Sequence, residues 1–350
     1  MGATDTAVET PRKRRLRAAG WCAGLAVLLC LTVVWAASVG PVTLSTATVA
    51  RVVLDALPGV EFRTTQTAEA VLMAVRLPRV ALAAVVGVGL AAAGTVMQGF
   101  FRNPMADPSV VGVSSGAAVG AVAVIVSSAS VPFGLGRQLA AFAGALLAGF
   151  FVYLLATENG RTPVATLLLA GVAVQTFLGA VVSLLIVQAD DQGLREATYW
   201  LMGNLHGATW EKVVVALPAV VVGTIVLFAF ARDLNVLLLG EADAGSLGVP
   251  VERTKRVLLA VSSLLTGAAV AVAGVIGFVG LVVPHAMRLL VGPDHRVLLP
   301  ASALAGGSFL VAADTAARTF VGGLPVGVVT AFVGVPFFLF LLRRREVSGL

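Results

Sequence analysis

Long uncharged stretches make up most of the chain between residues 18 and 342. Nine stretches of about 17 residues or more lack Asp, Glu, Lys and Arg, and they cover 18–50, 80–101, 108–136, 138–157, 162–189, 213–231, 257–287, 297–313 and 319–342. A helix of roughly 20 apolar residues crosses the ~30 Å hydrocarbon core of a bilayer. The pattern therefore predicts an all-α, polytopic membrane protein with a single transmembrane domain over residues 18–345.

One of the nine stretches is long enough to hold two helices. The segment 257–287 has a glycine-rich middle, from Gly274 to Gly280, and Pro284 follows it. Glycine and proline at this density favour a break in a helix. We expect a full helix at about 255–275 and a short one at about 282–291, which brings the predicted total to ten membrane helices.

The composition agrees with a membrane location. Of the 350 residues, 58% are hydrophobic and only 12% are charged, whereas soluble domains carry about 25% charged residues. So few charges could not cover the surface of a water-soluble globule of this size. A disordered chain is excluded for the opposite reason, because too much apolar surface would stay in water.

The basic residues lie mainly at the two ends of the chain. Five of them fall within residues 12–17, and Arg343, Arg344 and Arg345 lie near the carboxyl end. The positive-inside rule then places both termini in the cytoplasm, which an even number of helices allows. We expect a basic cytoplasmic segment at 1–17 and a cytoplasmic tail at 346–350. The net charge of +6 thus reflects membrane topology and does not indicate nucleic-acid binding.

A secretory signal peptide is the alternative interpretation of residues 12–40, with Trp35-Ala-Ala-Ser as its cleavage site. The apolar stretch of roughly 22 residues is longer than the 7–15 residues usual in a signal peptide. We therefore favour a retained first helix that ends at Gly40-Pro41.

The two halves of the chain show an internal repeat. A shift of 180 positions superposes nine identical residues in the 37-residue window 76–112, including Gly87 on Gly267 and Pro104 on Pro284. The copies begin at the second and seventh helices, five crossings apart, so they run in opposite directions. Helices 2–5 and 7–10 are then an inverted repeat, which is typical of transporters. Shared compositional bias is the alternative explanation.

Motifs for nucleotide binding and catalysis are missing from the sequence. None of the three lysines follows a glycine as a Walker A loop requires. His285 and His295 lie ten residues apart with no thiolate near them, so we expect no metal site and no cofactor on this chain. We also expect no catalytic residues.

A proton-coupled secondary transporter is the competing class, and it would need carboxylates inside the membrane. Asp314 is the one serious candidate, and its spacing to Arg318 predicts an i,i+4 ion pair instead. The energy for active transport must then come from another polypeptide.

Three polar regions stand out between the apolar stretches. The first is the turn that follows Gln98 and Asn103, where polar groups near the end of a membrane span favour a role in a pathway. The second is residues 233–253, where breaks at Gly240 and Gly248 fit two short amphipathic helices that dock a soluble partner. The third is a set of cations on the outer side that would bind either lipid headgroups or an acidic partner, namely Arg76, Arg79 and Arg318.

These motifs together resemble the FecCD-type permeases of bacterial ABC importers for iron-siderophores, haem and vitamin B12. The resemblance covers nearly everything after residue 70. It rests on Arg76-Leu-Pro-Arg79, Arg102-Asn-Pro-Met-Ala-Asp-Pro108, Val111-Gly-Val-Ser-Ser-Gly-Ala117, Leu239-Gly-Glu241, Leu247-Gly-Val249 and Gly277-Phe-Val-Gly-Leu-Val-Val-Pro-His-Ala-Met-Arg288.

The resemblance implies the fold of the vitamin B12 permease and a set of partners. A second permease subunit, identical or paralogous, would enclose the pathway, two cytoplasmic ATPases would bind ATP and Mg²⁺, and an extracytoplasmic binding protein would deliver the chelate. The protein would lie in the cytoplasmic (inner) membrane. The resemblance assigns binding-protein docking to Arg76, Arg79 and Arg318, and the ATPase coupling loop to Leu234, Leu239, Gly240, Glu241, Leu247 and Gly248.

The resemblance also implies a cytoplasmic gate and a cargo. The gate and pathway would involve Gln98, Asn103, Pro104, Met105, Pro163 and Thr166. The segment Pro163-Val-Ala-Thr166 lacks the small hydroxyl pair of the B12 permease. This departure favours an iron-siderophore as the cargo, with haem or vitamin B12 as the alternatives.

Overall fold

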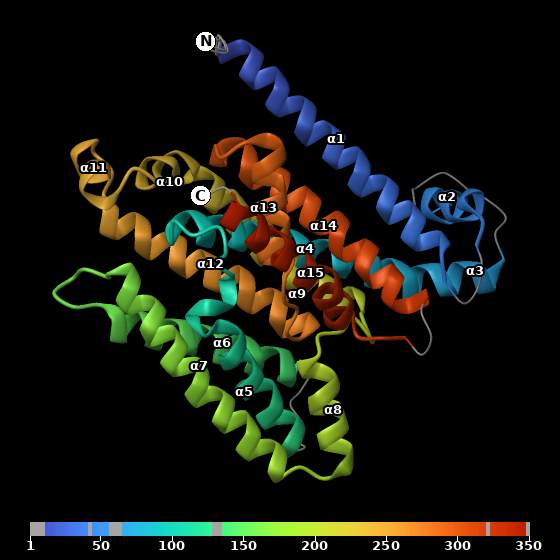
Figure 1. The fold of residues 1–350 in the computed structure, drawn as a ribbon. Helices are drawn as coiled ribbons and strands as arrows, with labels where there is room; N and C mark the ends of the chain where they lie inside the picture. The colour runs from blue at the N-terminus through green and yellow to red at the C-terminus, as the bar shows by residue number, and fades with distance from the viewer. Residues whose placement is uncertain (1–10, 41–43, 56–64, 128–134, 320–322, 348–350) are drawn as a thin grey trace.

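The computed structural model describes residues 11–40, 44–55, 65–127, 135–319 and 323–347. Every regular element in these ranges is a helix, and the long helices form one bundle (Figure 1). The predicted segment 1–17 and tail 346–350 lie partly outside the described residues. The all-α fold expected from the sequence is confirmed.

Ten apolar helices account for the bundle within the described part of the chain. Seven are long enough to cross a membrane, and three are shorter. The long ones are α1 (Pro11–Ser38), α4 (Leu77–Phe100) with its extension to Gln66, α6 (Gly136–Ala156), α7 (Val164–Val187), α9 (Trp210–Ala229), α12 (Val251–Ala273) and α14 (His295–Thr319). The shorter ones are α5 (Val113–Ser127), α13 (Val279–Val291) and α15 (Val326–Val347).

The break expected inside residues 257–287 lies between α12 and α13. Gly274 has φ +71°, and a Cβ there would collide with the carbonyl oxygen of Trp200. The carbonyl oxygen of Ala273, at the end of α12, accepts a 2.8 Å hydrogen bond from the backbone N–H of Asn204. Such partners are needed because a helix end inside a membrane has no water to bond its free carbonyls.

Several elements were not predicted from the uncharged stretches. Two short amphipathic helices, α2 (Thr46–Asp55) and α8 (Asp191–Leu201), and the 3₁₀ turn η2 (Pro108–Val111) carry too much charge or are too short for such a scan. The helix before α4 also begins earlier, through α3 (Gln66–Ala70) and the π-helical turn η1 (Val71–Arg76). It continues through Arg76 because that side chain is buried and donates a hydrogen bond to the carbonyl oxygen of Ala37.

The predicted loop 233–253 folds into two short helices. They are α10 (Ala231–Leu237) and α11 (Glu241–Ser246), and they are separated at Gly240, as expected. Both lie at the end of the bundle where α12 begins (Figure 1).

The packing of the bundle follows the predicted repeat of helices 2–5 and 7–10. In this repeat α4, α5 and α6 correspond to α12, α13 and α14. Corresponding helices make corresponding contacts: α4 packs on α14 and α12 packs on α6, while α5 packs on α6 and α13 packs on α14. Gly87 lies against Gly306 in the first of these pairs, and Gly267 lies against Ala145 in the second. The 180-residue register, however, holds only for α4 and α12. Pro284 lies inside α13, whereas Pro104 lies in the turn after α4.

Candidate functional site

Charged and polar side chains gather at the two opposite ends of the bundle. One end holds α10, α11, the turn 101–107 and the loop 157–163. The other end holds the arginines predicted to dock a partner and the carboxyl end of α1. The predicted sites therefore fall on two separate surfaces.

The predicted ion pair of Asp314 with Arg318 is present, and a third residue, Arg79, also pairs with Asp314. The Asp314 carboxylate is buried and lies 3.3 Å from Nε of Arg318, four residues later in α14. It also accepts three hydrogen bonds of 2.9–3.1 Å from Arg79 of α4. One carboxylate thus joins two guanidinium groups from two helices, and bidentate pairing of this kind is the strong form of such a contact.

Two of the three predicted docking arginines, Arg76 and Arg318, also bind the carboxyl end of α1. Arg76 donates a 2.9 Å hydrogen bond to the carbonyl oxygen of Ala37, and Arg318 donates a 3.1 Å hydrogen bond to that of Ala36. Cations near the last carbonyls of a helix are favoured by the helix dipole. These side chains are therefore largely buried, and they tie α1 to α4 and α14.

A cavity of about 460 Å³ brings the three predicted docking arginines together. Its lining is Val71, Val75, Arg76, Arg79, His206, Arg318 and Gly323. A second cavity of about 400 Å³ shares His206 and Gly323 with the first and also contains the ion pair of Arg137 with Glu196. Two adjoining cavities therefore lie at this end of the molecule. The docking role of the three arginines stays a prediction.

The predicted gate residues lie in different environments. Gln98 is buried, and its Nε2 donates a 3.0 Å hydrogen bond to the carbonyl oxygen of Leu281 near the start of α13. Asn103 is exposed, and its Oδ1 accepts the backbone N–H of Met105 at 3.0 Å. Gln98 therefore joins two helices, while Asn103 shapes the turn in which Pro104 and Met105 are half-buried.

The turn after α4 also carries a half-buried acid, Asp107. The Asp107 carboxylate accepts hydrogen bonds from the backbone N–H and the hydroxyl of Ser109. Burial raises the pKa of the Asp107 carboxyl, and the two bonds from Ser109 oppose that rise.

The helix α7, which follows the second predicted gate segment, packs on η2. Pro163 and Thr166 are exposed at the beginning of α7. Further along α7, the amide of Gln175 donates hydrogen bonds of 3.0 and 2.7 Å to the carbonyl oxygens of Ser109 and Val110. Gln175 was not predicted from the sequence, because an isolated glutamine in an apolar helix gives no sign of its partner.

The predicted coupling residues divide into a buried and an exposed group. Leu234 is fully buried and belongs to the core, whereas Leu239 and Leu247 are each 63% exposed. Gly240 and Gly248 adopt φ values of +127° and +86°, which favour glycine. The two glycines therefore set the turns that present the exposed leucines.

Contacts that the sequence did not predict hold α10 on the bundle. Asn235 of α10 donates a 2.5 Å hydrogen bond to the Asp294 carboxylate and accepts the backbone N–H of His295 at 2.9 Å. These residues lie about 60 positions apart in the sequence, and no local pattern links them.

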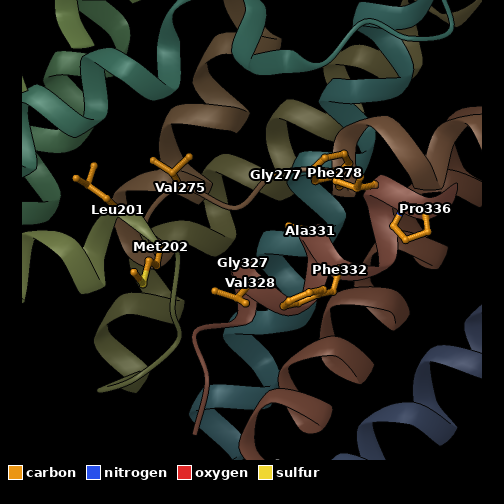
Figure 2. Close-up of a pocket in the computed structure, with 11 residues that line it drawn as sticks. Leu201, Met202, Val275, Gly277, Phe278, Gly327, Val328, Ala331, Phe332 and Pro336 are labelled. Atoms are coloured by element: carbon orange, nitrogen blue, oxygen red, sulfur yellow. The ribbon is translucent and has the colours of Figure 1, made fainter. Parts of the chain in front are cut away.

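An apolar pocket of about 620 Å³ opens beside the break between α12 and α13 (Figure 2). It lies between the end of α8, the segment 275–278 and one face of α15, and Phe332 of that face is 74% exposed. Phe278 has φ +67°, a rare value for a bulky residue, and its ring lies against Gly334. The lining is Leu201, Met202, Val275, Gly277, Phe278, Gly327, Val328, Ala331, Phe332, Val335 and Pro336.

The chain is similar over most of its length to known transport proteins. It is 54% identical to the cobalamin import system permease protein of Halobacterium salinarum, over 97% of this chain and 100% of that protein. It is 48% identical to the hemin transport system permease protein of Yersinia pestis, over 78% of this chain and 83% of that protein.

A solved structure has the same architecture. It shows an inward-facing conformation of a transporter assigned to the metal-chelate ABC type, and it superposes with a TM-score of 0.80 at 31% identity, over 92% of this chain and 98% of that one. The sequence model described as the FecCD transport family matches residues 28–344. The chain therefore belongs to the FecCD transport family and is a multi-pass permease subunit of an ABC importer.

Proposed function

We propose that this permease carries a metal chelate with a large apolar face across the cytoplasmic membrane, and that a corrinoid of the cobalamin type is its cargo. The observation that carries the proposal is the apolar pocket beside the broken helix, whose described lining contains no charged residue. A site of this kind suits a bulky ligand that must bind weakly and leave again, because it offers contact area with few directional bonds.

The comparisons support a corrinoid over the cargo that the sequence favoured. The relative that matches nearly the whole chain, at 54% identity, is named for cobalamin import, and the hemin permease also takes a planar tetrapyrrole. An iron-siderophore stays the second candidate, because the exposed segment from Pro163 to Thr166 lacks the hydroxyl pair of the B12 permease.

We further propose the partners that an ABC importer requires. Two ATPases bind the end of the bundle that holds α10 and α11, where Leu239 and Leu247 are exposed. A binding protein docks at the opposite end, where acidic side chains would meet three arginines. A second permease subunit packs against the exposed face of α15 and completes the pathway.

The experiment that tests this function is uptake by reconstituted complexes. The permease, its ATPase and its binding protein are placed in proteoliposomes, and accumulation of cyanocobalamin, hemin and a ferric hydroxamate is compared with and without ATP. We expect ATP-dependent uptake of cyanocobalamin. Uptake that needs no ATPase would overturn the importer, and ATP-dependent uptake of the ferric hydroxamate alone would overturn the corrinoid.

A further inference from the structure

Lys255 lies between the coupling loop, which the proposed function takes as the ATPase contact, and the gate segment predicted at the beginning of α7. Its side chain is buried near the beginning of α12, at 4% exposure. The ammonium group lies 3.0 Å from Glu241 of α11 and 3.1 Å from Glu252, one turn earlier in α12. A buried lysine needs such partners because an isolated charge in this position would be costly.

The second carboxylate extends the contact to another part of the molecule. Oε2 of Glu252 accepts the backbone N–H of Thr162 at 3.2 Å. The hydroxyl of Thr162 is in turn 2.9 Å from that of Thr157, whose hydroxyl donates a 2.7 Å hydrogen bond to the carbonyl oxygen of Tyr153 in α6. A continuous polar path therefore runs from α11 to the loop that immediately precedes α7.

The loop at the end of this path leads into the predicted gate segment. Thr162 is buried and directly precedes Pro163, at which α7 begins. Asn235 fixes α10 separately on the start of α14, and Gly240 lies between α10 and α11. The helix α11 can therefore move relative to α10, and such a movement would pull on Lys255.

We propose that Lys255 is a positioning residue that transmits ATPase-driven movement of α11, through Glu252, to the gate segment at the beginning of α7. The inference rests on the proposed function, because it takes α11 as an ATPase contact and the start of α7 as a gate. It adds a residue outside both regions, since Lys255 is buried and its ammonium group contacts Glu241 and Glu252.

If the ion pairs of Lys255 were purely structural, a different experimental result would be expected. Removing one partner of a buried ion pair is destabilising, because the remaining charge is left without compensation. A structural role would therefore change the stability of the complex and leave the ratio of transport to ATP hydrolysis intact. A transmitting role changes that ratio.

The first test compares Lys255→Met and Glu241→Gln with Asp243→Asn. Asp243 lies in the same short helix as Glu241 and is exposed, so its variant is a control for charge loss on α11. In proteoliposomes, we expect both test variants to lower cyanocobalamin uptake per ATP hydrolysed by about fivefold or more. For Lys255→Met, which lies outside the coupling loop, the ATPase activity should stay within about twofold. The Asp243→Asn variant should keep the wild-type ratio.

A second experiment measures the accessibility of the predicted gate segment in the absence of cargo. Thr166→Cys is introduced after Cys22 and Cys30 are replaced by alanine, and its labelling by a maleimide is compared with and without ATP and vanadate. Trapping should change the labelling rate in the wild-type background and not in the Lys255→Met background.

The outcomes separate this inference from the function on which it rests. If the wild-type complex shows neither ATP-dependent uptake nor a nucleotide-dependent change at Thr166, the proposed function fails. If the wild type shows both and the Lys255 and Glu241 variants match it, the transmission path is overturned. Should Lys255→Met not assemble, Glu241→Gln decides the question, because the Glu241 side chain is 41% exposed and its substitution leaves no buried charge without a partner.

Discussion

At the scale of single residues, charges inside the bundle are placed by partners that lie far away in the sequence. The i,i+4 spacing of Asp314 and Arg318 predicted their ion pair, because both lie on one helix. The pairing of Asp314 with Arg79, 235 positions away, could not be predicted, since it depends on how α4 packs against α14. Lys255 and Gln175 were missed for the same reason.

The Asp314 cluster makes a prediction about stability. Asp314→Ala removes the carboxylate that, within the described residues, pairs with both Arg79 and Arg318, and it should lower the free energy of unfolding by about 3–5 kcal/mol, because two largely buried cations lose their shared partner. Thermal unfolding in detergent measures the effect. Glu196→Gln is the control, because it breaks the partly exposed pair with Arg137 and should cost about 1 kcal/mol or less. Equal losses in the two variants would contradict the argument.

The arginine cavity makes a prediction about docking. Arg318→Gln leaves Arg79 to pair with Asp314, so folding should be kept while one cation is lost from the cavity. We expect the affinity for the binding protein to fall about tenfold at low salt, and the difference from wild type to shrink as salt is added, because salt screens the long-range attraction between the cations of the cavity and an acidic partner. Binding to the permease in nanodiscs, followed by surface plasmon resonance, measures both effects. Arg137→Gln, in the adjoining cavity, is the comparison variant, and a salt-independent loss would argue against electrostatic docking.

At the scale of helices, glycine positions decide where the backbones approach each other. The glycine-rich run after Ala273 predicted the break between α12 and α13, because glycine and proline act locally. The register of the repeat was predicted only as far as α4 and α12. Beyond them a helix in one half corresponds in sequence to a turn in the other, and tertiary packing, which no local pattern encodes, sets the difference.

A substitution at Gly94 tests whether the close contact between α4 and α13 requires a residue without a Cβ. A Cβ at this position would collide with the carbonyl oxygen of Gly280, and the backbone there cannot withdraw as a side-chain tip could. Gly94→Ala should lower the free energy of unfolding by about 1–3 kcal/mol, the usual cost of overpacking.

Gly179 supplies the matched control for this substitution. It lies in α7 with no atom within 4 Å of where its Cβ would be. Gly179→Ala should be neutral or stabilising by up to about 1 kcal/mol, because alanine favours a helix more than glycine does. Thermal unfolding in detergent compares the two variants, and a loss at Gly179 as large as that at Gly94 would refute the close-packing argument.

At the scale of the whole molecule, the placement of charge decides which end of the bundle meets which partner. If the amino end starts in the cytoplasm, as the positive-inside rule predicts, ten membrane crossings would put both basic ends of the chain on one side, together with α10 and α11. The same predicted orientation would place the arginine cavity and α8 on the extracytoplasmic side of the membrane. The coupling loop and the docking surface must therefore lie on opposite faces of the membrane, so one labelling experiment tests both assignments.

Substituted cysteines should report this orientation directly. In a protein with Cys22→Ala and Cys30→Ala, Asp243→Cys on α11 and Gln192→Cys on α8 introduce single exposed thiols at opposite ends of the bundle. A membrane-impermeant maleimide should label Gln192→Cys in spheroplasts and Asp243→Cys in inverted vesicles, because each thiol is then on the accessible side. Detergent-solubilised protein is the control and should label at both positions. The reverse pattern would place α11 outside, and neither an ATPase at α11 nor a binding protein at the arginine cavity could then reach its surface.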